Sequence, residues 1–447
     1  MKVVFLVTSS GGSFYCSNCY RDMLYFTAVR INEGVESSAI PLYLPPEKIY
    51  VESGFDQNVF FGAISLYIRE RVHFLSKMPA FLDRILDSGP LLRLAAQRAG
   101  TTRSEGLEDL TLNMISSHVS TRENEIKRLV RYMNRNGKPD VIHLSNALVI
   151  GLAGQIKKEL DVKIVCSLQN EDDWLNEMAE PYQSKAWKMI EEEAEHVDAF
   201  VCPSRYFRDF FLSRAAIPAE KIHIIPSGIE TWDHVPSQAK DRAQAIGFFS
   251  RVSYHNGFDK LVDAFLLLKK ENGFKDLELH VCGGYTADDK PFIAEQIKKI
   301  KDSGYREYIR IFPGFQGRGK IDFLDSIDIM SVPVRKYDGY GLYILEANVA
   351  SVPVVQPATG AFPEILDATG GGVIYNPDTV EALAENLRSL LLDPSKAREL
   401  GETGRKNVLG KLTHKHMGNI TVCCKVAGSI AISSFPYLVY ISKRIGL

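Results

Sequence analysis

Two carboxylates, Asp338 and Glu346, stand eight residues apart in the stretch YDGYGLYILEANVASVPVV at 337–355. A Gly-rich turn at 339–341 lies between them, and a helix-like segment continues past Glu346. Such a turn lets the backbone approach a phosphate closely, and the helix after it presents free N–H groups. Glu346, about one turn into the helix, is placed to face ribose hydroxyls, and Asp338 can reach the sugar. The spacing therefore fits a site for a nucleoside-diphosphate sugar.

A second interpretation of the same stretch needs no ligand. In it, Asp338 caps the turn or the helix with its carboxylate, and Glu346 is an acid on a solvated helix face. The spacing of the two acids is compatible with both interpretations.

Short apolar runs rich in Val and Ile, alternating with helical patterns, must position these residues. The predicted strands of the first half are 2–7, 140–145, 163–168, 199–204 and 221–226. After a polar segment at 227–245, the predicted strands are 245–252, 277–284, 308–314, 329–334, 352–357 and 372–377. Alternating strands and helices predict an α/β fold with parallel sheets and right-handed crossovers.

A chain of 447 residues is too long for one typical core, so two domains are expected. We predict a first Rossmann-like domain over 1–232, a second over 233–412 and an apolar tail over 413–447. The two domains are expected to face a central cleft.

Two segments depart from the α/β rhythm. Residues 66–103 carry seven basic and three acidic residues, a net +4, and predict either a packed helical hairpin or a surface for an anionic membrane or an acceptor. The tail is apolar from 426 to 441 but contains Pro436. Because a spanning helix needs roughly 20 apolar residues, we expect an interfacial or irregular end.

The composition limits the class of protein. Hydrophobic residues make up 45% and charged residues 24%, which is ordinary for a globular chain, and the net charge is −2. Neither a global positive field nor a basic-aromatic pattern predicts a nucleic-acid partner. The first apolar run reads as a buried strand rather than a signal peptide, and seven scattered cysteines do not form a secreted disulfide framework. We therefore expect a cytoplasmic protein, with 66–103 and the tail as candidate membrane contacts.

Four motifs resemble one enzyme family. The segment 337–365 is similar to the signature of retaining GT-B glycosyltransferases of family 4, the glycogen-synthase-like group, including Gly360 and Glu364. The segments FFSRVSYHNGFDKLVDAF (248–265), LELHVCGG (277–284) and FPGFQG (312–317) resemble further family motifs in the family's order. The first domain is similar through SSGG after the first strand and through IHIIPSGIE at 222–230.

The resemblance implies a GT-B fold and roles for individual residues. The catalytic set would be Asp338, Arg251 and Glu346, with Arg251 neutralising the diphosphate as a planar cation. The donor-binding set would be Gly11, Gly12, Arg251, Asn256, Lys260, Gly283, Asp338, Gly341, Leu342, Tyr343, Glu346 and Gly360.

Two positions depart from the family pattern. Asn256 stands where the family has a cationic Lys, and Lys260 follows four residues later. Asp338 stands where the family usually has Glu, which shortens the reach by one methylene. Loss of one charge-assisted bond to the diphosphate costs on the order of 2–4 kcal/mol of transition-state stabilisation unless another group replaces it.

The acceptor is expected on the first domain, close to the ends of its strands. The candidate residues are Arg21, His143, Asn146, Gln169, Glu171 and Asp172. His143 lies in an apolar run, so it is either a satisfied core histidine or a cleft residue. Glu171 and Asp172 either orient an acceptor or begin a helix.

The Cys-x-x-Cys pair Cys16 and Cys19 follows the Gly-Gly loop. The alternatives are thiols at a helix start near the donor cleft, half of a metal site, or a redox dithiol. A zinc site needs two more ligands, and no second Cys-x-x-Cys exists in the sequence. No metal and no cofactor are predicted.

We therefore expect a transferase that moves a sugar from a UDP- or GDP-sugar to a hydroxyl of a glycan, lipid or small molecule, with retention of configuration. The alternatives are a non-catalytic nucleotide-sugar-binding protein of the same fold and a nucleotide-sugar epimerase. The oligomeric state is not predicted.

Overall fold

The computed structural model describes residues 1–8, 14–43, 51, 54–61, 104–118, 123–231, 244–335 and 338–417. The predicted insertion at 66–103, the part of the predicted tail from 418 onward, and the Gly11–Gly12 pair lie outside these residues.

The first sheet has six parallel strands in the order β2-β1-β3-β4-β5-β6. Its strands are β1 (Lys2–Val7), β2 (Glu36–Pro41), β3 (Val141–Leu144), β4 (Lys163–Ser167), β5 (Ala199–Cys202) and β6 (Ile222–Ile224). Five of them match predicted strands. The sequence pattern did not predict β2, because this edge strand begins with polar residues and carries only a short apolar end.

The second sheet has six parallel strands in the order β12-β11-β10-β7-β8-β9. Its strands are β7 (Ala245–Phe249), β8 (Glu278–Cys282), β9 (Ile309–Phe312), β10 (Ile329–Met330), β11 (Val354–Pro357) and β12 (Gly372–Tyr375). The strand predicted at 329–334 is shorter in the structure. Val332 donates its backbone N–H to the Gln356 side chain, so the ladder does not continue there.

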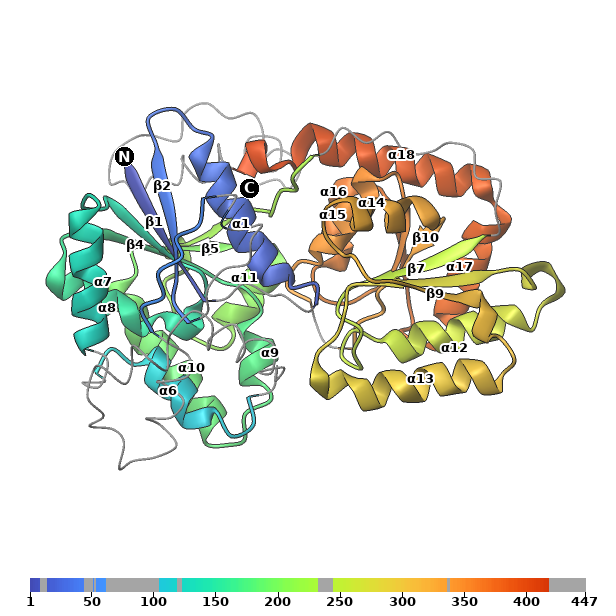
Figure 1. The fold of residues 1–447 in the computed structure, drawn as a ribbon, viewed down its shortest axis with the longest axis horizontal. Helices are drawn as coiled ribbons and strands as arrows, with labels where there is room; N and C mark the ends of the chain where they lie inside the picture. Colours follow the sequence, from blue (N-terminus) through green and yellow to red (C-terminus); the bar gives the residue numbers. More distant parts are fainter. Residues whose placement is uncertain are drawn as a thin grey trace.

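Helices cover both sheets, and the prediction of an α/β fold with two parallel-sheet units is confirmed (Figure 1). In the first unit they are α1 (Ser17–Arg30), α6 (Glu108–Ile115), α7 (Glu123–Arg135), α8 (Gly151–Glu159), α9 (Glu171–Leu175), α10 (Tyr182–Glu193) and α11 (Arg205–Leu212). In the second they are α12 (Phe258–Lys269), α13 (Lys290–Asp302), α14 (Gly317–Ser326), α15 (Leu342–Val349), α16 (Phe362–Thr369), α17 (Val380–Leu392) and α18 (Pro394–Lys411).

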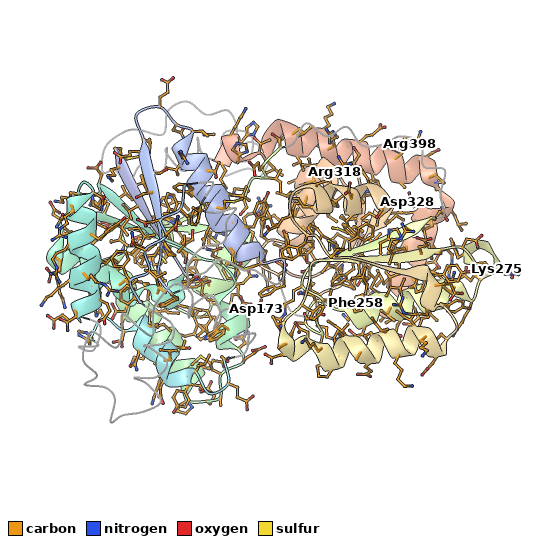
Figure 2. All side chains as sticks on the ribbon, in the orientation of Figure 1. Asp173, Phe258, Lys275, Arg318, Asp328 and Arg398 are labelled. Atoms are coloured by element: carbon orange, nitrogen blue, oxygen red, sulfur yellow. A yellow bond between two sulfur atoms is a disulfide. The ribbon has the colours of Figure 1, made fainter. Side chains whose placement is uncertain are left out.

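Apolar side chains fill the space between the sheets and their helices. Figure 2 shows Phe258 inside the second unit, where it is buried against Phe248, and Lys275 at its periphery. The helix α1 is buried on most of its surface, and its apolar residues join a core cluster that continues into the second unit. This helix therefore helps to hold the two units together.

The end of α18 returns to the first unit. Thr413 forms a parallel bridge with Ile229, and the backbone N–H of Gly228 donates to the Met417 sulfur. The link between the units lies partly outside the described residues, at 232–243, so the domain boundaries at 232 and 412 stay predictions. Across the described parts of the chain, none of the helices has an apolar stretch of the length that a bilayer crossing requires.

Candidate functional site

The carboxyl ends of the strands in both units meet at their common surface. The segment after β1 pairs with the segment after β8, since Phe14 bridges Gly284 and the Tyr15 N–H donates to the Gly283 carbonyl at 2.6 Å. In doubly wound α/β folds, ligands bind outside the carboxyl ends of the strands. Apart from Gly11 and Gly12, which lie outside the described residues, the residues predicted from the sequence as donor contacts belong to the second unit.

Asp338 caps the turn that precedes α15. Its Oδ1 accepts hydrogen bonds from the backbone N–H groups of Tyr340 (2.8 Å) and Gly341 (2.7 Å), and its Oδ2 accepts from the Tyr343 hydroxyl at 3.2 Å. Gly341, the N-terminal cap of α15, takes a left-handed conformation with φ of +70°, which favours glycine. The capping interpretation of Asp338 is therefore confirmed, and a sugar contact from the same carboxylate stays a prediction.

Gly360 brings the loop before α16 onto this turn. A Cβ atom at Gly360 would lie 2.5 Å from the Asp338 carbonyl oxygen, so a larger residue would push the two segments apart. Leu342 is the first residue of α15, and Leu342 and Tyr343 are both buried. The structure therefore groups Asp338, Gly341, Leu342, Tyr343 and Gly360 around the start of α15.

Glu346 is fully buried in α15, and both of its carboxylate oxygens are occupied. Lys320 on α14 donates to Oε1 at 2.7 Å, and the Tyr15 hydroxyl donates to Oε2 at 2.5 Å. Burial disfavours the charge on Lys320, but the nearby Glu346 carboxylate outweighs this effect and raises the pKa of Lys320. Burial and the same carboxylate raise the pKa of Tyr15, which keeps the phenol protonated as a donor. The solvated-acid interpretation of Glu346 is therefore wrong.

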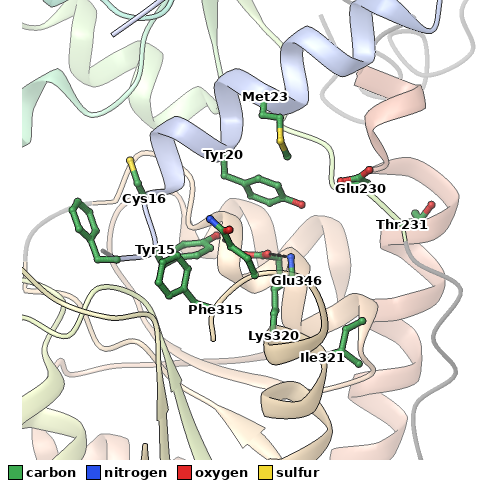
Figure 3. A pocket seen from close by; sticks show the side chains of 13 residues that line it. Tyr15, Cys16, Tyr20, Met23, Glu230, Thr231, Phe315, Lys320, Ile321 and Glu346 are labelled. Atoms are coloured by element: carbon green, nitrogen blue, oxygen red, sulfur yellow. Dashed lines mark hydrogen bonds and ion pairs between the residues drawn. The ribbon is translucent and has the colours of Figure 1, made fainter. Parts of the chain in front are cut away.

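A cleft of about 260 Å³ opens beside this group (Figure 3). Figure 3 shows Tyr20, Lys320 and Glu346 gathered between α1 and the second unit, with Phe315 nearby. The lining residues are Phe14, Tyr15, Cys16, Tyr20, Met23, Glu230, Thr231, Phe315, Gln316, Gly317, Lys320, Ile321 and Glu346. The cleft thus combines aromatic surfaces with a buried carboxylate, which suits a flat base joined to a diol.

Arg251 lies at the edge of the same region. Its guanidinium forms a two-pronged pair with Asp289, with Nε–Oδ2 at 2.8 Å and Nη2–Oδ1 at 2.9 Å, and lies 5.6 Å from the centre of the Phe14 ring. Asp289 also closes a capping box with Thr286 at the start of a short helical turn. Although burial opposes it, the Arg251 bond helps to lower the pKa of Asp289, so the pair is ionic. Asp289 was not a predicted site residue.

Asn256 and Lys260 have structural partners. The Asn256 amide donates to the Ser250 hydroxyl (3.2 Å) and the Arg251 carbonyl (2.8 Å), which fixes the loop after β7. Lys260 pairs with Asp378 at 2.7 Å and is not among the residues that line the cleft. Lys320 is therefore the lysine that the structure brings into the cleft, from α14, the helix that begins at the end of the FPGFQG motif.

The predicted acceptor residues gather at the strand ends of the first unit. The Gln169 amide donates to the Asp22 carboxyl group at 2.6 Å and also to the Ser145 carbonyl. Glu171 accepts from the backbone N–H groups of Ala147 and Gln169, both at 2.8 Å, and therefore ties two strand ends together. Burial raises the pKa of Glu171 to about 7.

His143 lies inside the sheet rather than in the cleft lining. Its Nε2 lies 2.9 Å from the Ser167 hydroxyl, and its ring packs on Phe5 at 4.7 Å between ring centres. Burial lowers the pKa of His143 to about 3, so the imidazole is neutral. Asn146 caps a helical turn through its Oδ1, while Asp172 is buried in α9.

Cys16 and Cys19 form a disulfide at the start of α1, with Cα atoms 5.4 Å apart. The predicted place of the pair at a helix start is right, because Cys16 precedes α1 and lines the cleft, but the prediction of free thiols is wrong, since the two sulfurs are bonded. Within the described residues, no group of three or more His, Cys, Asp or Glu side chains could hold a metal ion.

Comparison with known protein families finds matches in both units of the chain. The family described as "Glycosyl transferases group 1" matches residues 231–407, and "Glycosyltransferase Family 4" matches residues 115–233. The chain belongs to the family 4 glycosyltransferases. The two matches meet where the link between the two units begins.

Two curated relatives of this glycosyltransferase come from one organism. The α-maltose-1-phosphate synthase of Mycolicibacterium smegmatis is 27% identical over 309 residues, which is 63% of this chain and 77% of that protein. The GDP-mannose-dependent α-(1-6)-phosphatidylinositol monomannoside mannosyltransferase of the same organism is 28% identical over 242 residues, or 50% of this chain and 60% of that protein.

A solved structure supports the GT-B architecture. Anabaena Alr3699/HepE in complex with UDP and glucose superposes with a TM-score of 0.68 at 13% identity, covering 96% of this chain and 100% of that chain. At this identity the likeness concerns the fold. The two six-stranded sheets of the glycosyltransferase are thus the two halves of a GT-B fold.

Contacts between the two halves complete the site of the glycosyltransferase. The Glu364 carboxylate accepts from the backbone N–H groups of Arg205 and Tyr206 at the start of α11, and the Ser204 hydroxyl donates to the Gly339 carbonyl at 2.7 Å. The Tyr340 hydroxyl donates to the Ser227 carbonyl at 2.7 Å. Residues from the signature of the second half therefore dock on strand ends of the first.

Three residues of this site escaped the sequence analysis: Tyr15, Lys320 and Asp289. Each reaches its partner from another element, so no short motif contains both members of a pair. A local signal existed only for Asp289, which ends the Thr286–Asp289 capping box.

Proposed function

We propose that this glycosyltransferase moves a sugar from a nucleoside-diphosphate sugar to a hydroxyl acceptor, with retention of the anomeric configuration. The observation that carries the proposal is Glu346, a fully buried carboxylate at the wall of an aromatic cleft within the family signature. A carboxylate in this position accepts from both hydroxyls of a ribose, as the family resemblance implies.

The rest of the donor has matching groups in the second half. Arg251 offers a planar, always-charged donor for the diphosphate, although it must share its charge with Asp289. The turn at 339–341 and the start of α15 offer backbone N–H groups, and the Gly360 loop closes on the sugar side. The GDP-mannose dependence of one relative and the UDP bound to one structural neighbour make UDP and GDP the first nucleotides to test.

In the proposed reaction the bond between the sugar C1 and the phosphate oxygen breaks. The acceptor oxygen forms its bond to C1 on the same face, and its proton passes to the leaving diphosphate. The chain's part is to hold the diphosphate at Arg251 and the ribose at Glu346, and to exclude water between the two halves. Asp338 orients the sugar in this proposal and keeps the turn closed.

A nucleotide panel tests the donor site. UDP, GDP and ADP, each with its sugars, are screened by thermal shift. A ligand at 100 times its Kd stabilises by roughly 2.7 kcal/mol. We expect at least one nucleotide to raise the melting temperature, and Arg251→Met to remove the response. The matched control is Arg388→Met, since Arg388 holds Glu271 through a similar two-pronged pair on α17. No response to any nucleotide would contradict the proposal.

A second candidate function is nucleotide-sugar binding without transfer. Asn256 favours it, because this residue supplies no cation to the diphosphate and is engaged in loop contacts. Saturable nucleotide binding with neither transfer nor donor hydrolysis would favour the binding protein. Release of nucleoside diphosphate on addition of an acceptor would favour the transferase.

A further inference from the structure

Arg21 is a buried arginine whose guanidinium has no hydrogen-bond partner in the described parts of the chain. The residue is 1% exposed, and Nε, Nη1 and Nη2 are all unpaired. It lies on α1 together with Asn18, Asp22 and Tyr25, at the i, i+3, i+4 and i+7 spacing of one helix face. A buried charge without a counter-ion is costly, so such a group is rare unless a partner arrives from outside the chain.

Asp22, the nearest acid in the sequence, does not neutralise Arg21. Burial raises the pKa of Asp22 to about 8, although the Gln169 hydrogen bond and Arg21 act against it, so the carboxyl group is protonated near pH 7. Its Oδ1 accepts from Gln169 rather than from Arg21. The other groups close enough to Arg21 to interact electrostatically include the Tyr25 and Tyr340 hydroxyls and the Cys202 thiol, which are neutral at this pH because burial raises each of their pKa values.

More unpaired polar atoms lie on α1 with Arg21 and in the segment that follows β4. They are Asn18 Oδ1, Gln169 Oε1 and Asn170 Oδ1, each without a hydrogen-bond partner among the described residues, while the Ser227 hydroxyl interacts with the Tyr25 hydroxyl on α1. We call Asn18, Arg21, Gln169, Asn170 and Ser227 the Arg21 cluster.

Hydrogen bonds and close packing link residues of the Arg21 cluster to one another and to the second half. The Asn18 amide donates to the Gln169 carbonyl, and the Ser227 carbonyl accepts from Tyr340. A Cβ atom at Gly339 would lie 2.6 Å from Asn170 Oδ1. The cluster thus lies on the strand ends of the first half, and the segment at 339–340 of the second half covers it.

We propose that the Arg21 cluster binds an anionic group, a phosphate or a carboxylate, on the acceptor. The guanidinium supplies the planar fork that binds such oxyanions through two bonds, and the Ser227 hydroxyl can donate a further bond. The amide oxygens of Asn18, Gln169 and Asn170 accept from hydroxyl groups of the molecule that carries the anion. This inference rests on the proposed function, because it places the acceptor opposite the donor signature.

The cluster is distinct from the donor groups. Arg251 has its own partners in Asp289 and Phe14, and Arg21 is not among the residues that line the cleft beside Glu346. Gly339 and Tyr340 of the second half contact Asn170 and the Ser227 carbonyl, so separation of the two halves would open the Arg21 cluster to an acceptor. The subsequent closure buries the bound anion.

The test uses the full chain with inorganic phosphate, glycerol 3-phosphate and uncharged glycerol, followed by calorimetry and thermal shift. We expect phosphate and glycerol 3-phosphate to bind and glycerol not to bind. Arg21→Met should weaken the binding of both anions about 10- to 100-fold, because hydrogen bonds to a charged group are lost. Arg21→Lys keeps the charge but loses the fork, so it should give a smaller loss in a folded protein. Arg30→Met, on the exposed end of the same helix, is the matched control and should bind like the wild type.

Nucleotide binding separates this inference from the proposed function. We expect Arg21→Met to retain the response to UDP or GDP, and Arg251→Met to retain the response to phosphate. Loss of the nucleotide response in Arg21→Met, with its retention in Arg251→Met, would assign Arg21 to the donor and overturn the inference. Absence of phosphate binding to the wild type would also overturn the inference. Unchanged phosphate binding in Arg21→Met would do the same. Absence of nucleotide binding in every variant would instead contradict the proposed function alone.

Discussion

Two buried charged side chains, Glu346 and Arg21, lie where the two halves of this glycosyltransferase meet. They differ in whether the fold provides them with hydrogen-bond partners. Glu346 has both oxygens occupied, by Lys320 and Tyr15. Arg21 has three nitrogens without a partner among the described residues. A charge that the fold itself satisfies is stable without any ligand, whereas an unsatisfied one lowers stability until a ligand binds. The comparison indicates that Glu346 is stable in the ligand-free protein, while the Arg21 cluster depends on its ligand.

The largest change in stability should come from breaking the buried ion pair between Glu346 and Lys320. Glu346→Gln removes the buried carboxylate that accepts from Lys320 and should lower the free energy of unfolding by about 3–5 kcal/mol. Urea denaturation measures this loss. The control is Glu271→Gln, which breaks a more exposed pair with Arg388 and should cost about 0–1 kcal/mol.

The double variant Glu346→Gln/Lys320→Met removes both charges. It should regain most of the stability but not the nucleotide binding. Equal costs for Glu346→Gln and Glu271→Gln would show that burial of the Glu346 pair has no energetic weight.

The pH dependence of the free energy of unfolding should reflect Asp22, the residue next to Arg21 in the sequence. Burial raises the pKa of Asp22 from 3.8 to about 8, so the native state keeps a proton that the unfolded chain releases near pH 4. Stability should therefore fall as the pH rises from about 5 to 8, by at most about 1.4 kcal/mol per pH unit for this group. Burial also raises the pKa of Glu171, to about 7, so this group too should lower the stability as the pH rises.

Asp22→Asn tests this origin of the pH dependence. The amide oxygen can still accept from Gln169, but the group no longer titrates, so urea midpoints measured from pH 5 to 8 should become flatter. Asp173→Asn, at an exposed position on α9, is the control and should retain the wild-type slope. A wild-type slope in Asp22→Asn would rule out this carboxyl group as its source.

Removal of the unsatisfied charge of Arg21 should change the stability in the opposite direction from the Glu346→Gln substitution. Arg21→Met removes an unpaired buried group and should raise the free energy of unfolding of the ligand-free protein by about 1–3 kcal/mol. Urea denaturation of Arg21→Met and Arg30→Met in phosphate-free buffer gives the comparison. A loss of stability in Arg21→Met would mean that the guanidinium is satisfied in solution.

The smallest effect concerns the Tyr15 hydroxyl, which occupies an oxygen of Glu346 that a ribose needs. Tyr15→Phe removes this competitor, so the Kd for the nucleotide should fall about fivefold, equivalent to about 1 kcal/mol for one hydrogen bond. Calorimetry with UDP or GDP measures the change, and Tyr285→Phe, at an exposed position, is the control. Weaker binding in Tyr15→Phe would instead make Tyr15 a ligand of the donor.

Much of the fold was predictable from short patterns. The runs rich in Val and Ile correctly predicted five strands of the first sheet, because strands buried on both faces need continuous apolar side chains. The edge strand β2 lacks that pattern and was missed. The strand predicted at 329–334 was too long, since a side-chain hydrogen bond at Val332 replaces the ladder.

The sequence by itself determined the class of the fold, the family signature and the turn before α15. Asp338, the Gly-rich turn and the following helix are neighbours in the chain, so local backbone geometry specifies them. Only the tertiary structure decided that Lys320 and Tyr15 meet at Glu346 and that Arg21 finds no partner. These outcomes depend on contacts between residues 26 and 331 positions apart and on burial by the opposite half. No local pattern encodes such burial, because it arises only when the two halves pack against each other.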